Sequence, residues 1–389
     1  MENVSFNLND NVLNLSLHGQ IDSANAADVE KALQTVRTAH PASQTILDCD
    51  DLSYISSAGL RVILRLKKAV PDIRLINVNS EIYEVFDMTG FTELMDIQKA
   101  YRRLSVEGCE VIGRGANGMV YRIDRDTIVK QYFSPDALPE IKRERELART
   151  AFVLGVPTAI PYDVVRIEGG GYGSVFELLN AQSYSQLLSS GEKTVDETVR
   201  MSTELLQLIH HTVVKPGSMP SMKQTALKWA SFLKDHLPKE LFEKLYGLID
   251  AVPEDYHMIH GDYHIKNVML QNGESLLIDM DTLCHGHPIF ELASMYNAYC
   301  GYSELVPSRS QQFLGISHEM AAEFWKKSLR LYLDGAPEET VRSVEEKAMI
   351  VGYTRILRRD IRHHEAQEEI DCCIQHLAEL LPRTDTLLF

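Results

Sequence analysis

The sequence has no long hydrophobic run, because its apolar stretches are short and interrupted by charged residues. A helix needs roughly 20 consecutive apolar residues to cross a bilayer, so no membrane span is predicted. The first ten residues, MENVSFNLND, also lack the basic and apolar segments of a secretory signal peptide. We therefore expect a cytoplasmic protein that does not enter a membrane.

Cysteine is scarce and shows no ligand spacing. The six cysteines stand at positions 49, 109, 284, 300, 372 and 373, without a C-x-x-C motif or paired histidines. Disulfide frameworks and zinc sites have such spacings, whereas scattered thiols are typical of reducing compartments. The pattern predicts free thiols, in agreement with a cytoplasmic location.

Positive charge is in deficit as well. The chain has 39 Lys and Arg against 55 Asp and Glu, a formal net charge of −16. Nucleic acids and anionic membranes bind basic surfaces, so neither is expected as the main partner. The run LRLKK at 64–68 is predicted to be the solvated face of a helix.

The length of 389 residues exceeds what one hydrophobic core usually serves, and the pattern of elements changes near residues 98–106. Before this point short strands and helices alternate. The predicted strands are 12–17, 45–50 and 74–79, and the predicted helices are 23–39, with Ser23 as N-cap, 59–70 and 81–91. After it, strands surround a glycine-rich turn and helices then dominate. We predict an α/β domain at 1–100 and a second domain at 106–389.

A serine pair, Ser56 and Ser57, stands between a strand and a helix in DLSYISSAGLRVIL. Unpaired N–H groups at a helix start favour a hydroxyl cap or a phosphate. The serines can therefore be interpreted either as an N-cap or as a phosphorylation site. This segment, with HGQIDSANA before it and VFDMTGFTELMDI after it, resembles the STAS domain of anti-sigma factor antagonists over residues 3–97. The resemblance implies binding to an anti-sigma factor or similar regulator, with Ser57 as phosphoacceptor. Ser56 stands where the best-known members carry Asp.

The second domain begins with VIGRGANGMVYRI, in which Gly113, Gly115 and Gly118 match G-x-G-x-x-G. Alone, the motif also suits a dinucleotide site or a plain turn. A dinucleotide site requires a helix directly after the glycines, whereas a strand pattern follows here. The flanks therefore favour the glycine-rich hairpin that covers nucleotide phosphates in kinases.

Lys130 lies inside an apolar strand, TIVKQY. A lysine in such a place needs an anionic partner, unless the strand is an exposed edge. Phosphates of ATP and a carboxylate of the next helix would both serve. Of Glu144 and Glu146, Glu144 is favoured because its spacing from Ile141 puts it near the inward face.

The third motif is MIHGDYHIKNVMLQNGESLLIDMDT. Asp262 and Asn267 are five residues apart, and Asp279 ends an apolar strand. Phosphoryl transfer needs a base that orients the acceptor and oxygen ligands for Mg²⁺, which this set provides. His260 is expected to hold the loop rather than carry protons, and Asp281 to be either a supporting acid or exposed.

Together the three motifs resemble the aminoglycoside phosphotransferase and choline kinase superfamily, relatives of the protein kinases. The resemblance covers residues 106–300, and the helical tail is expected in the same domain. It implies a bilobal α+β kinase-like fold, with an N-lobe at about 106–180 and a C-lobe at about 181–389. It also implies ATP and Mg²⁺ as cofactors. The roles it implies are Asp262 as catalytic base, Asn267 and Asp279 as metal ligands, and Gly113, Gly115, Gly118, Lys130, Glu144, Glu177 and Leu178 around ATP.

The sequence thus predicts an ATP-dependent phosphotransferase fused to a STAS domain. The acceptor is either a small alcohol, aminoglycoside-like molecules included, or a protein serine such as Ser57. The alternative is a signalling protein whose kinase-like half only senses nucleotide; the retained lysine and acids favour an enzyme. The helices around 190–250 and 300–389, which would choose the acceptor, show no motif.

Overall fold

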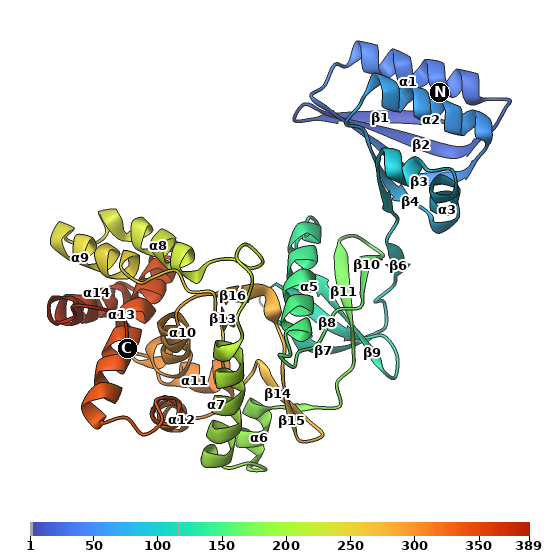
Figure 1. Ribbon diagram of the computed structural model, residues 1–389. Coiled ribbons are helices and arrows are strands. Elements are labelled where there is room, and N and C mark those ends of the chain that lie inside the picture. The colour runs from blue at the N-terminus through green and yellow to red at the C-terminus, as the bar shows by residue number, and fades with distance from the viewer. Residues whose placement is uncertain (1–2, 116) are drawn as a thin grey trace. The chain divides into compact units, whose positions relative to one another are not determined.

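The computed structural model describes residues 3–115 and 117–389, and the chain forms two units (Figure 1). The first contains the chain up to Ser105 together with Val165–Glu168; the second contains Val106–Val164 and Gly169–Phe389. Each unit has its own cluster of buried apolar side chains.

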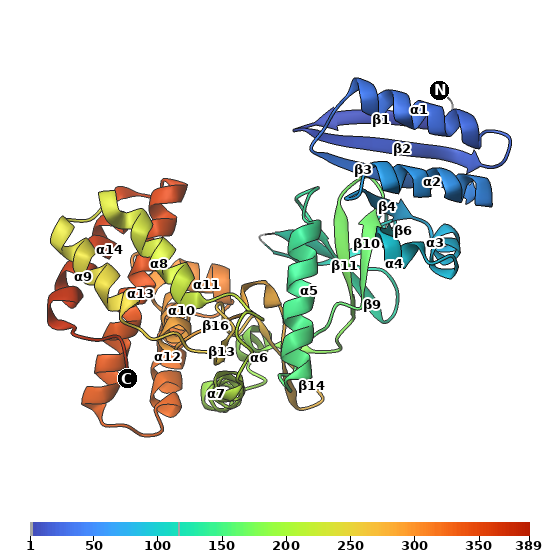
Figure 2. The same cartoon turned by 45° about the horizontal axis from the view of Figure 1, so that its top comes forward.

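The first unit is a five-stranded sheet with helices, in the order β1-β2-β3-β4-β5. The pair β1–β2 is antiparallel and the other pairs are parallel. The strands are β1 (Val4–Asn9), β2 (Val12–Ile21), β3 (Gln44–Ile55), β4 (Arg74–Val78) and β5 (Asp96–Lys99). The helices are α1 (Ala26–Ala39), α2 (Ser57–Ala69), α3 (Ser80–Met88) and α4 (Phe91–Leu94). Helices α1 and α2 contact each other and lie side by side in Figure 1, and the turned view of Figure 2 shows the strands β1 and β2 between them in projection.

The predicted start of the first helix is wrong. Helix α1 begins at Ala26 after the N-cap Asn25, three residues later than the predicted start at Ser23. The Asp22 carboxylate accepts the N–H groups of Ala24 and Asn25 and holds residues 22–25 in a turn. Such a local side-chain bond competes with the helix for the same backbone donors.

The second unit begins with the antiparallel strands β7 (Glu110–Arg114), β8 (Gly118–Arg122), β9 (Thr127–Tyr132) and β11 (Tyr172–Glu177), in the order β11-β9-β8-β7. Strand β10 (Asp163–Ile167), of which Val165–Ile167 belong to the first unit, pairs in parallel with β6 (Arg102–Leu104) of that unit. Helix α5 (Leu138–Val153) packs against β11. This sheet and helix form the first lobe of a kinase-like fold.

The rest of the second unit is mainly helical and forms the other lobe. Its helices are α6 (Tyr184–Ser190), α7 (Val195–His211), α8 (Met222–Phe232), α9 (Lys239–Asp250), α10 (Ile289–Tyr299), α11 (Ser308–Leu314), α12 (His318–Tyr332), α13 (Glu338–His363) and α14 (Gln367–Leu380). Short 3₁₀ turns occupy Leu233–Asp235, Met280–Thr282, Gly301–Ser303 and Leu381–Arg383. Among the described residues, no helix combines the length and apolar composition that crossing a membrane requires.

Four short strands in this lobe position the polar loop 260–267. They are β13 (Met258–Ile259), β14 (Val268–Gln271), β15 (Glu274–Leu277) and β16 (Cys284–His285), with β12 (Gln182–Ser183) beside β14. Met258, Ile259 and Val268, which flank the loop, are fully buried. Both ends of the loop are therefore anchored in the core, and its polar residues lie between them.

Candidate functional site

The predicted nucleotide, metal and catalytic positions meet at one cavity of about 480 Å³ in the second unit. The cavity lining includes Gly113, Gly115, Gly118, Lys130, Glu144, Glu177, Leu178, Asp262, Asn267 and Asp279. These residues come from both lobes and from segments far apart in the chain. A volume of this size is typical of small-molecule sites.

The glycine-rich segment is the hairpin turn between β7 and β8, and its Ala116 lies outside the described residues. The Gly115 N–H donates to the Gly118 carbonyl at 3.0 Å. A Cβ on Gly118 would lie 2.2 Å from the Gln131 carbonyl oxygen, so no side chain fits there. Glycine at this position lets β8 approach β9 closely while the turn covers the cavity.

Lys130 on β9 faces two carboxylates. Its Nζ lies 3.2 Å from Glu144 Oε1 on α5 and 2.9 Å from Asp279 Oδ1. Glu144 is only 5% exposed, whereas Glu146 is exposed, so the lysine pairs with Glu144. Burial lowers the pKa of Lys130, but the two carboxylates outweigh this effect, and the pKa lies well above its ordinary range. Lys130 is therefore charged at neutral pH.

The loop that carries Asp262 is held by its own side chains. The Asn267 amide N–H donates to the Asp262 carbonyl at 3.0 Å. The Asp262 N–H donates to His260 Nδ1 at 3.3 Å, while the other ring nitrogen lies 3.3 Å from the Ile278 carbonyl. Both His260 nitrogens are thus engaged with backbone, which gives the ring a supporting place in the loop. Gly261 has φ +83°, a conformation that favours glycine.

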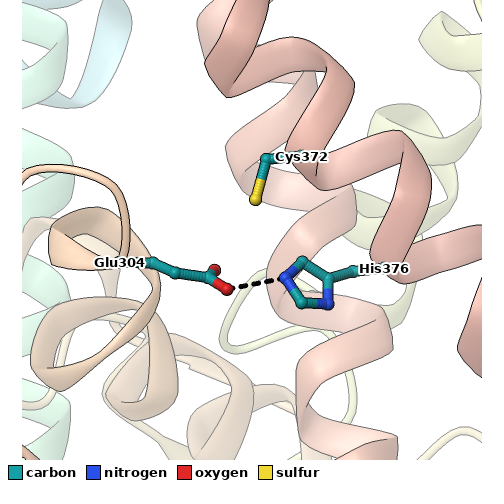
Figure 3. A group of neighbouring side chains, drawn as sticks. All are labelled: Glu304, Cys372 and His376. Carbon is teal, nitrogen blue, oxygen red and sulfur yellow. Dashed lines mark hydrogen bonds and ion pairs between the residues drawn. The ribbon is translucent and has the colours of Figure 1, made fainter.

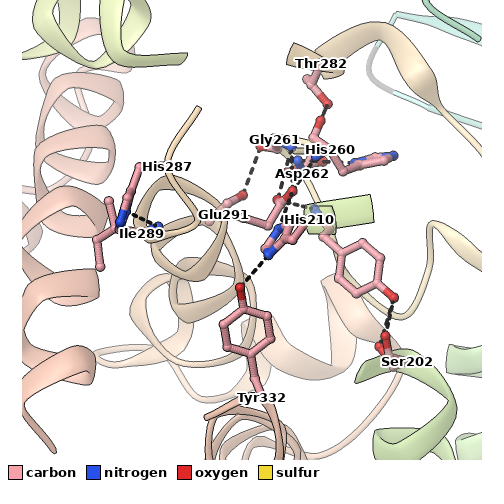
Figure 4. A network of polar contacts seen from close by, with 12 residues as sticks. Ser202, His210, His260, Gly261, Asp262, Thr282, His287, Ile289, Glu291 and Tyr332 are labelled. Atoms are coloured by element: carbon pink, nitrogen blue, oxygen red, sulfur yellow. Dashed lines mark hydrogen bonds and ion pairs between the residues drawn. The ribbon is translucent and has the colours of Figure 1, made fainter. Parts of the chain in front are cut away.

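A buried carboxylate that is not among the predicted site residues anchors this loop. Glu291 of α10 is fully buried and accepts backbone N–H groups from His260, from Gly261 at 3.0 Å and from Tyr263 at 3.3 Å. Figure 4 shows this network. Burial raises the pKa of Glu291, but the nearby rings of His210, whose Nε2 lies 4.0 Å from Oε2, and of His260 outweigh this effect, so the pKa is lowered. The available sequence signal was an acidic residue inside the apolar segment Phe-Glu-Leu-Ala at 290–293.

Asp262 is ionised under ordinary conditions. Its Oδ2 lies 3.3 Å from His264 Nε2, and its Oδ1 lies 3.5 Å from the guanidinium of Arg355. Burial raises the pKa of Asp262, but the hydrogen bond with His264 and the positive charges around it outweigh this effect. The pKa lies well below its usual range. Asp262 can therefore accept a hydrogen bond from an acceptor hydroxyl.

Two further acids face the cavity. Asp279 has φ +62°, which is uncommon for a residue other than glycine, and its side chain is 45% exposed. Asp281 also lines the cavity, where burial and the charge of Asp279 raise its pKa to about 6. The site thus holds more negative charge than Lys130 neutralises.

These residues fit a divalent cation. The Asn267 amide nitrogen turns toward the loop, and no described residue donates to its Oδ1. An amide oxygen beside carboxylates is a donor set that suits Mg²⁺. The raised pKa of Asp281 supports this fit, because a bound cation would relieve the excess negative charge.

A second pocket lies among the C-terminal helices that were expected to choose the acceptor, although the sequence did not predict its lining residues. Its volume is about 740 Å³, and Asp262 lines both this pocket and the nucleotide-type cavity. Four arginines of its wall lie on α13, at positions 355, 358, 359 and 362. Their i, i+3, i+4, i+7 spacing puts them on one helix face. That periodicity was the available signal.

In the first unit, Ser56 and Ser57 differ in their hydrogen bonding and exposure. Ser56 is the N-cap of α2, where its hydroxyl accepts the N–H groups of Ala58 at 3.2 Å and Gly59 at 3.4 Å. Ser57 is exposed. Since Asp is also a good N-cap, Ser56 occupies a position that both residue types fill well.

Comparison with known families agrees with both halves. The family of phosphotransferase enzymes matches residues 108–322, and the STAS domain matches residues 3–105. The first of these matches covers more than half of the 389 residues. The chain therefore belongs to the phosphotransferase enzyme family, with a STAS domain as its N-terminal part.

Individual relatives are similar to one half or the other. BtrV of Bordetella bronchiseptica, described as an anti-sigma factor antagonist, is 33% identical over 92 residues, which are 23% of this chain and 78% of that protein. The anti-sigma-B factor antagonist of Bacillus subtilis is 28% identical over 99 residues, 24% of this chain and 89% of that protein.

Solved structures are similar to the second half. The crystal structure of aminoglycoside phosphotransferase APH(4)-Ia matches 70% of this chain and 93% of that chain, with 10% identity and a TM-score of 0.50. A thermostable mutant of that enzyme has been solved in a ternary complex with AMP-PNP and hygromycin B. The match covers 71% of this chain and 94% of that chain, with 12% identity and a TM-score of 0.50. At such identities the likeness concerns the fold.

Proposed function

We propose that the second unit transfers the γ-phosphoryl group of ATP to a hydroxyl group. The observation that carries the proposal is the single cavity in which Lys130, Asp262 and Asp279 meet. A paired, charged lysine, an ionised acid and further oxygen donors are the parts that phosphoryl transfer needs. The similar fold solved with AMP-PNP motivates a nucleotide as the donor.

In this proposal the nucleotide lies between the glycine turn and β11. Backbone N–H groups of Gly113, Gly115 and Gly118 approach the phosphates, and the charged Lys130 binds them while Glu144 fixes its position. Glu177 and Leu178, at the end of β11, meet the adenine through backbone groups. Asn267 and Asp279 would hold Mg²⁺, which would neutralise phosphate charge.

Asp262 orients the acceptor. Its carboxylate accepts a hydrogen bond from the acceptor hydroxyl, whose oxygen forms a new bond to the γ-phosphorus. The bond between the γ-phosphorus and the bridging oxygen breaks, and ADP leaves with that electron pair. The hydroxyl proton passes to Asp262 and from there to solvent, so no covalent enzyme intermediate is needed.

The STAS domain supplies the second part of the proposal. Its relatives are named as anti-sigma factor antagonists, which supports a regulatory protein as the partner of this half. Phosphate on the exposed Ser57 would add a charge of about −1.5 to −2 at the start of α2. If Ser57→Asp left binding of such a partner unchanged, this switch would be excluded.

The enzyme proposal is tested by ATP consumption with Mg²⁺, alone and with choline, glucose, kanamycin or the protein itself as acceptor. We expect Asp262→Asn to lower the rate by about 10²-fold or more, since general bases contribute 10²–10⁴-fold. The exposed Asp235 provides the control Asp235→Asn. Mass spectrometry of Ser57 after incubation reports self-modification.

Equal ATP consumption by the wild type and Asp262→Asn under every condition would remove the enzyme proposal. If the protein nevertheless bound nucleotide, the alternative of a nucleotide-sensing signalling protein would take its place.

A further inference from the structure

The second pocket, which shares Asp262 with the nucleotide-type cavity, is strongly basic, in a protein whose net charge is −16. Arginines at 309, 355, 358, 359 and 362 line it, together with His363. Because Asp262 lines both spaces, a molecule in this basic pocket would have its hydroxyl beside the acid that faces the nucleotide. The pocket therefore lies where an acceptor must bind.

The arginines differ in how their charge is neutralised. Arg309 forms a bidentate pair with Glu369, and Arg359 lies 3.1 Å from Asp360 and 3.7 Å from Glu365. Arg355 contacts Asp262 at 3.5 Å and donates to the Gly261 carbonyl and the Ser294 hydroxyl. These three are held in place by their partners.

Among the described residues, Arg358 and Arg362 have no such partner. No carboxylate of the described residues lies within ion-pair distance of either guanidinium group. Burial, followed by repulsion from Arg362 and Arg355, lowers the pKa of Arg358. Like charges gathered without counter-ions cost free energy, which a bound anion would recover.

Aromatic rings support the cationic wall. The Arg355 guanidinium lies 5.5 Å from the centre of the Trp229 ring, and that of Arg359 lies 5.2 Å from the Tyr302 ring. Such stacking orients guanidinium groups while leaving their N–H donors free for an anion. The rings also offer flat apolar surface to the body of a small molecule.

We infer that the acceptor is a small alcohol that carries at least two negative charges, such as a phosphorylated sugar. This inference rests on the proposed function and names its substrate class. The volume of about 740 Å³ suits a small molecule, and guanidinium groups bind phosphate and carboxylate oxygens in a bidentate manner. Aminoglycosides, which carry several ammonium groups, would be repelled by the same wall.

The test is calorimetric titration of the full-length protein with fructose 1,6-bisphosphate and, separately, with kanamycin. Each titration is run with and without saturating Mg²⁺ and AMP-PNP. When AMP-PNP fills the nucleotide-type cavity, binding that remains is assigned to the basic pocket, and binding that disappears is assigned to the nucleotide-type cavity. The variant Arg358→Gln/Arg362→Gln is compared with Lys239→Gln/Lys326→Gln, which removes the same charge at exposed positions outside the pocket. Circular dichroism and melting temperature check the fold of both.

We expect the wild type to bind the bisphosphate with AMP-PNP present, and the arginine variant to bind it at least tenfold more weakly. The lysine control should match the wild type. Equal or absent bisphosphate binding in all three proteins, or tighter binding of kanamycin than of the bisphosphate by the wild type, would overturn the inference. The comparison of kanamycin with the bisphosphate is made on the wild type alone, so it holds even if the arginine variant does not fold.

Failure of this inference is separable from failure of the proposed function. AMP-PNP binding is measured first on the same samples. Absence of nucleotide binding would count against the phosphotransferase proposal, whereas nucleotide binding without preference for the bisphosphate would exclude only the anionic acceptor.

Discussion

At the scale of single residues, Glu291 shows how one buried carboxylate organises a polar loop. Its two oxygens receive the backbone N–H groups of His260, Gly261 and Tyr263, which would otherwise be unpaired inside the core. A buried donor without an acceptor costs about 1–3 kcal/mol. The position of Asp262 therefore depends on Glu291, which does not itself line the cavity.

We predict that Glu291→Gln lowers the free energy of unfolding of the second unit by about 1–3 kcal/mol, because one carboxylate oxygen is replaced by a donor. The measurement is denaturant unfolding followed by tryptophan fluorescence, since both tryptophans, Trp229 and Trp325, lie in this unit.

The exposed Glu339 on α13 provides the control Glu339→Gln, which should change stability by less than about 0.5 kcal/mol. Similar stabilities for the Glu291 and Glu339 variants would show that the loop does not need the buried carboxylate.

At the scale of elements, the glycine turn depends on the close approach of β8 to β9. Gly118→Ala would force a Cβ into the Gln131 carbonyl oxygen, so the strands must separate or shift. We predict at least tenfold weaker AMP-PNP binding, measured by calorimetry, because the turn would no longer cover the cavity.

Gly247→Ala on α9 is the matched control, since nothing lies within 4 Å of the added Cβ. Alanine is a better helix former than glycine by about 1 kcal/mol, so this variant should be as stable as the wild type or more so. Unchanged AMP-PNP affinity in Gly118→Ala would contradict the assigned place of the turn.

Helix α14 is joined to the segment after α10 by an ion pair. His376 Nε2 lies 2.6 Å from Glu304 Oε1, with Cys372 one turn before the histidine (Figure 3). The His376 ring also stacks on Tyr353, at 4.4 Å between ring centres. The hydrogen bond to Glu304 raises the pKa of His376 above its ordinary 6.5. Burial raises the pKa of Glu304, but hydrogen bonds from His376 and Tyr353 outweigh it and lower the pKa.

These shifts predict a pH-dependent stability. The histidine contribution is complete below its unfolded pKa of about 6.5 and is lost as the pH rises through the raised folded value. The glutamate contribution is present above about 4.5 and is lost at lower pH. The difference in unfolding free energy between wild type and His376→Gln should therefore be largest near pH 5.5–6.5 and smaller at pH 9.

The expected change is small, about 0.5 kcal/mol, because both side chains are partly exposed. Loss of the Tyr353 stack lowers stability at every pH, so only the pH-dependent part counts. Glu304→Gln should remove the same dependence. A stability difference that stays constant from pH 5.5 to 9 would exclude the ion pair as its source.

Helices and strands with a clear hydrophobic periodicity were predictable from the sequence, whereas strands with few buried residues were not. In β2, Leu13, Leu15 and Leu17 alternate with polar residues and are all buried, as a half-buried strand requires. The edge strands β1 and β5 were missed. Only one residue of β1 and none of β5 is buried, which leaves little apolar signal.

At the scale of the whole molecule, the two hydrophobic cores have no residue in common. We predict that Leu15→Ala, in the first core, destabilises the first unit by about 2–5 kcal/mol. The unfolding transition of the second unit, reported by tryptophan fluorescence, should keep its midpoint, while circular dichroism should show an additional, earlier transition. An equal shift of the fluorescence transition would mean that the units unfold together.

The sequence by itself predicted an α/β first domain and a largely helical end of the second, because hydrophobic periodicity and glycine turns are local properties of the chain. The kinase-like fold of the second domain was implied by the resemblance of its three motifs to a known superfamily. The sequence also predicted that Lys130, Asp262 and Asp279 belong to one site, and the three residues do line one cavity. Only the tertiary structure decided that Lys130 pairs with Glu144, that Glu291 holds the loop, and that arginines of α13 lie beside Asp262. Those facts depend on contacts between segments 14 to more than 90 residues apart, which no local pattern contains.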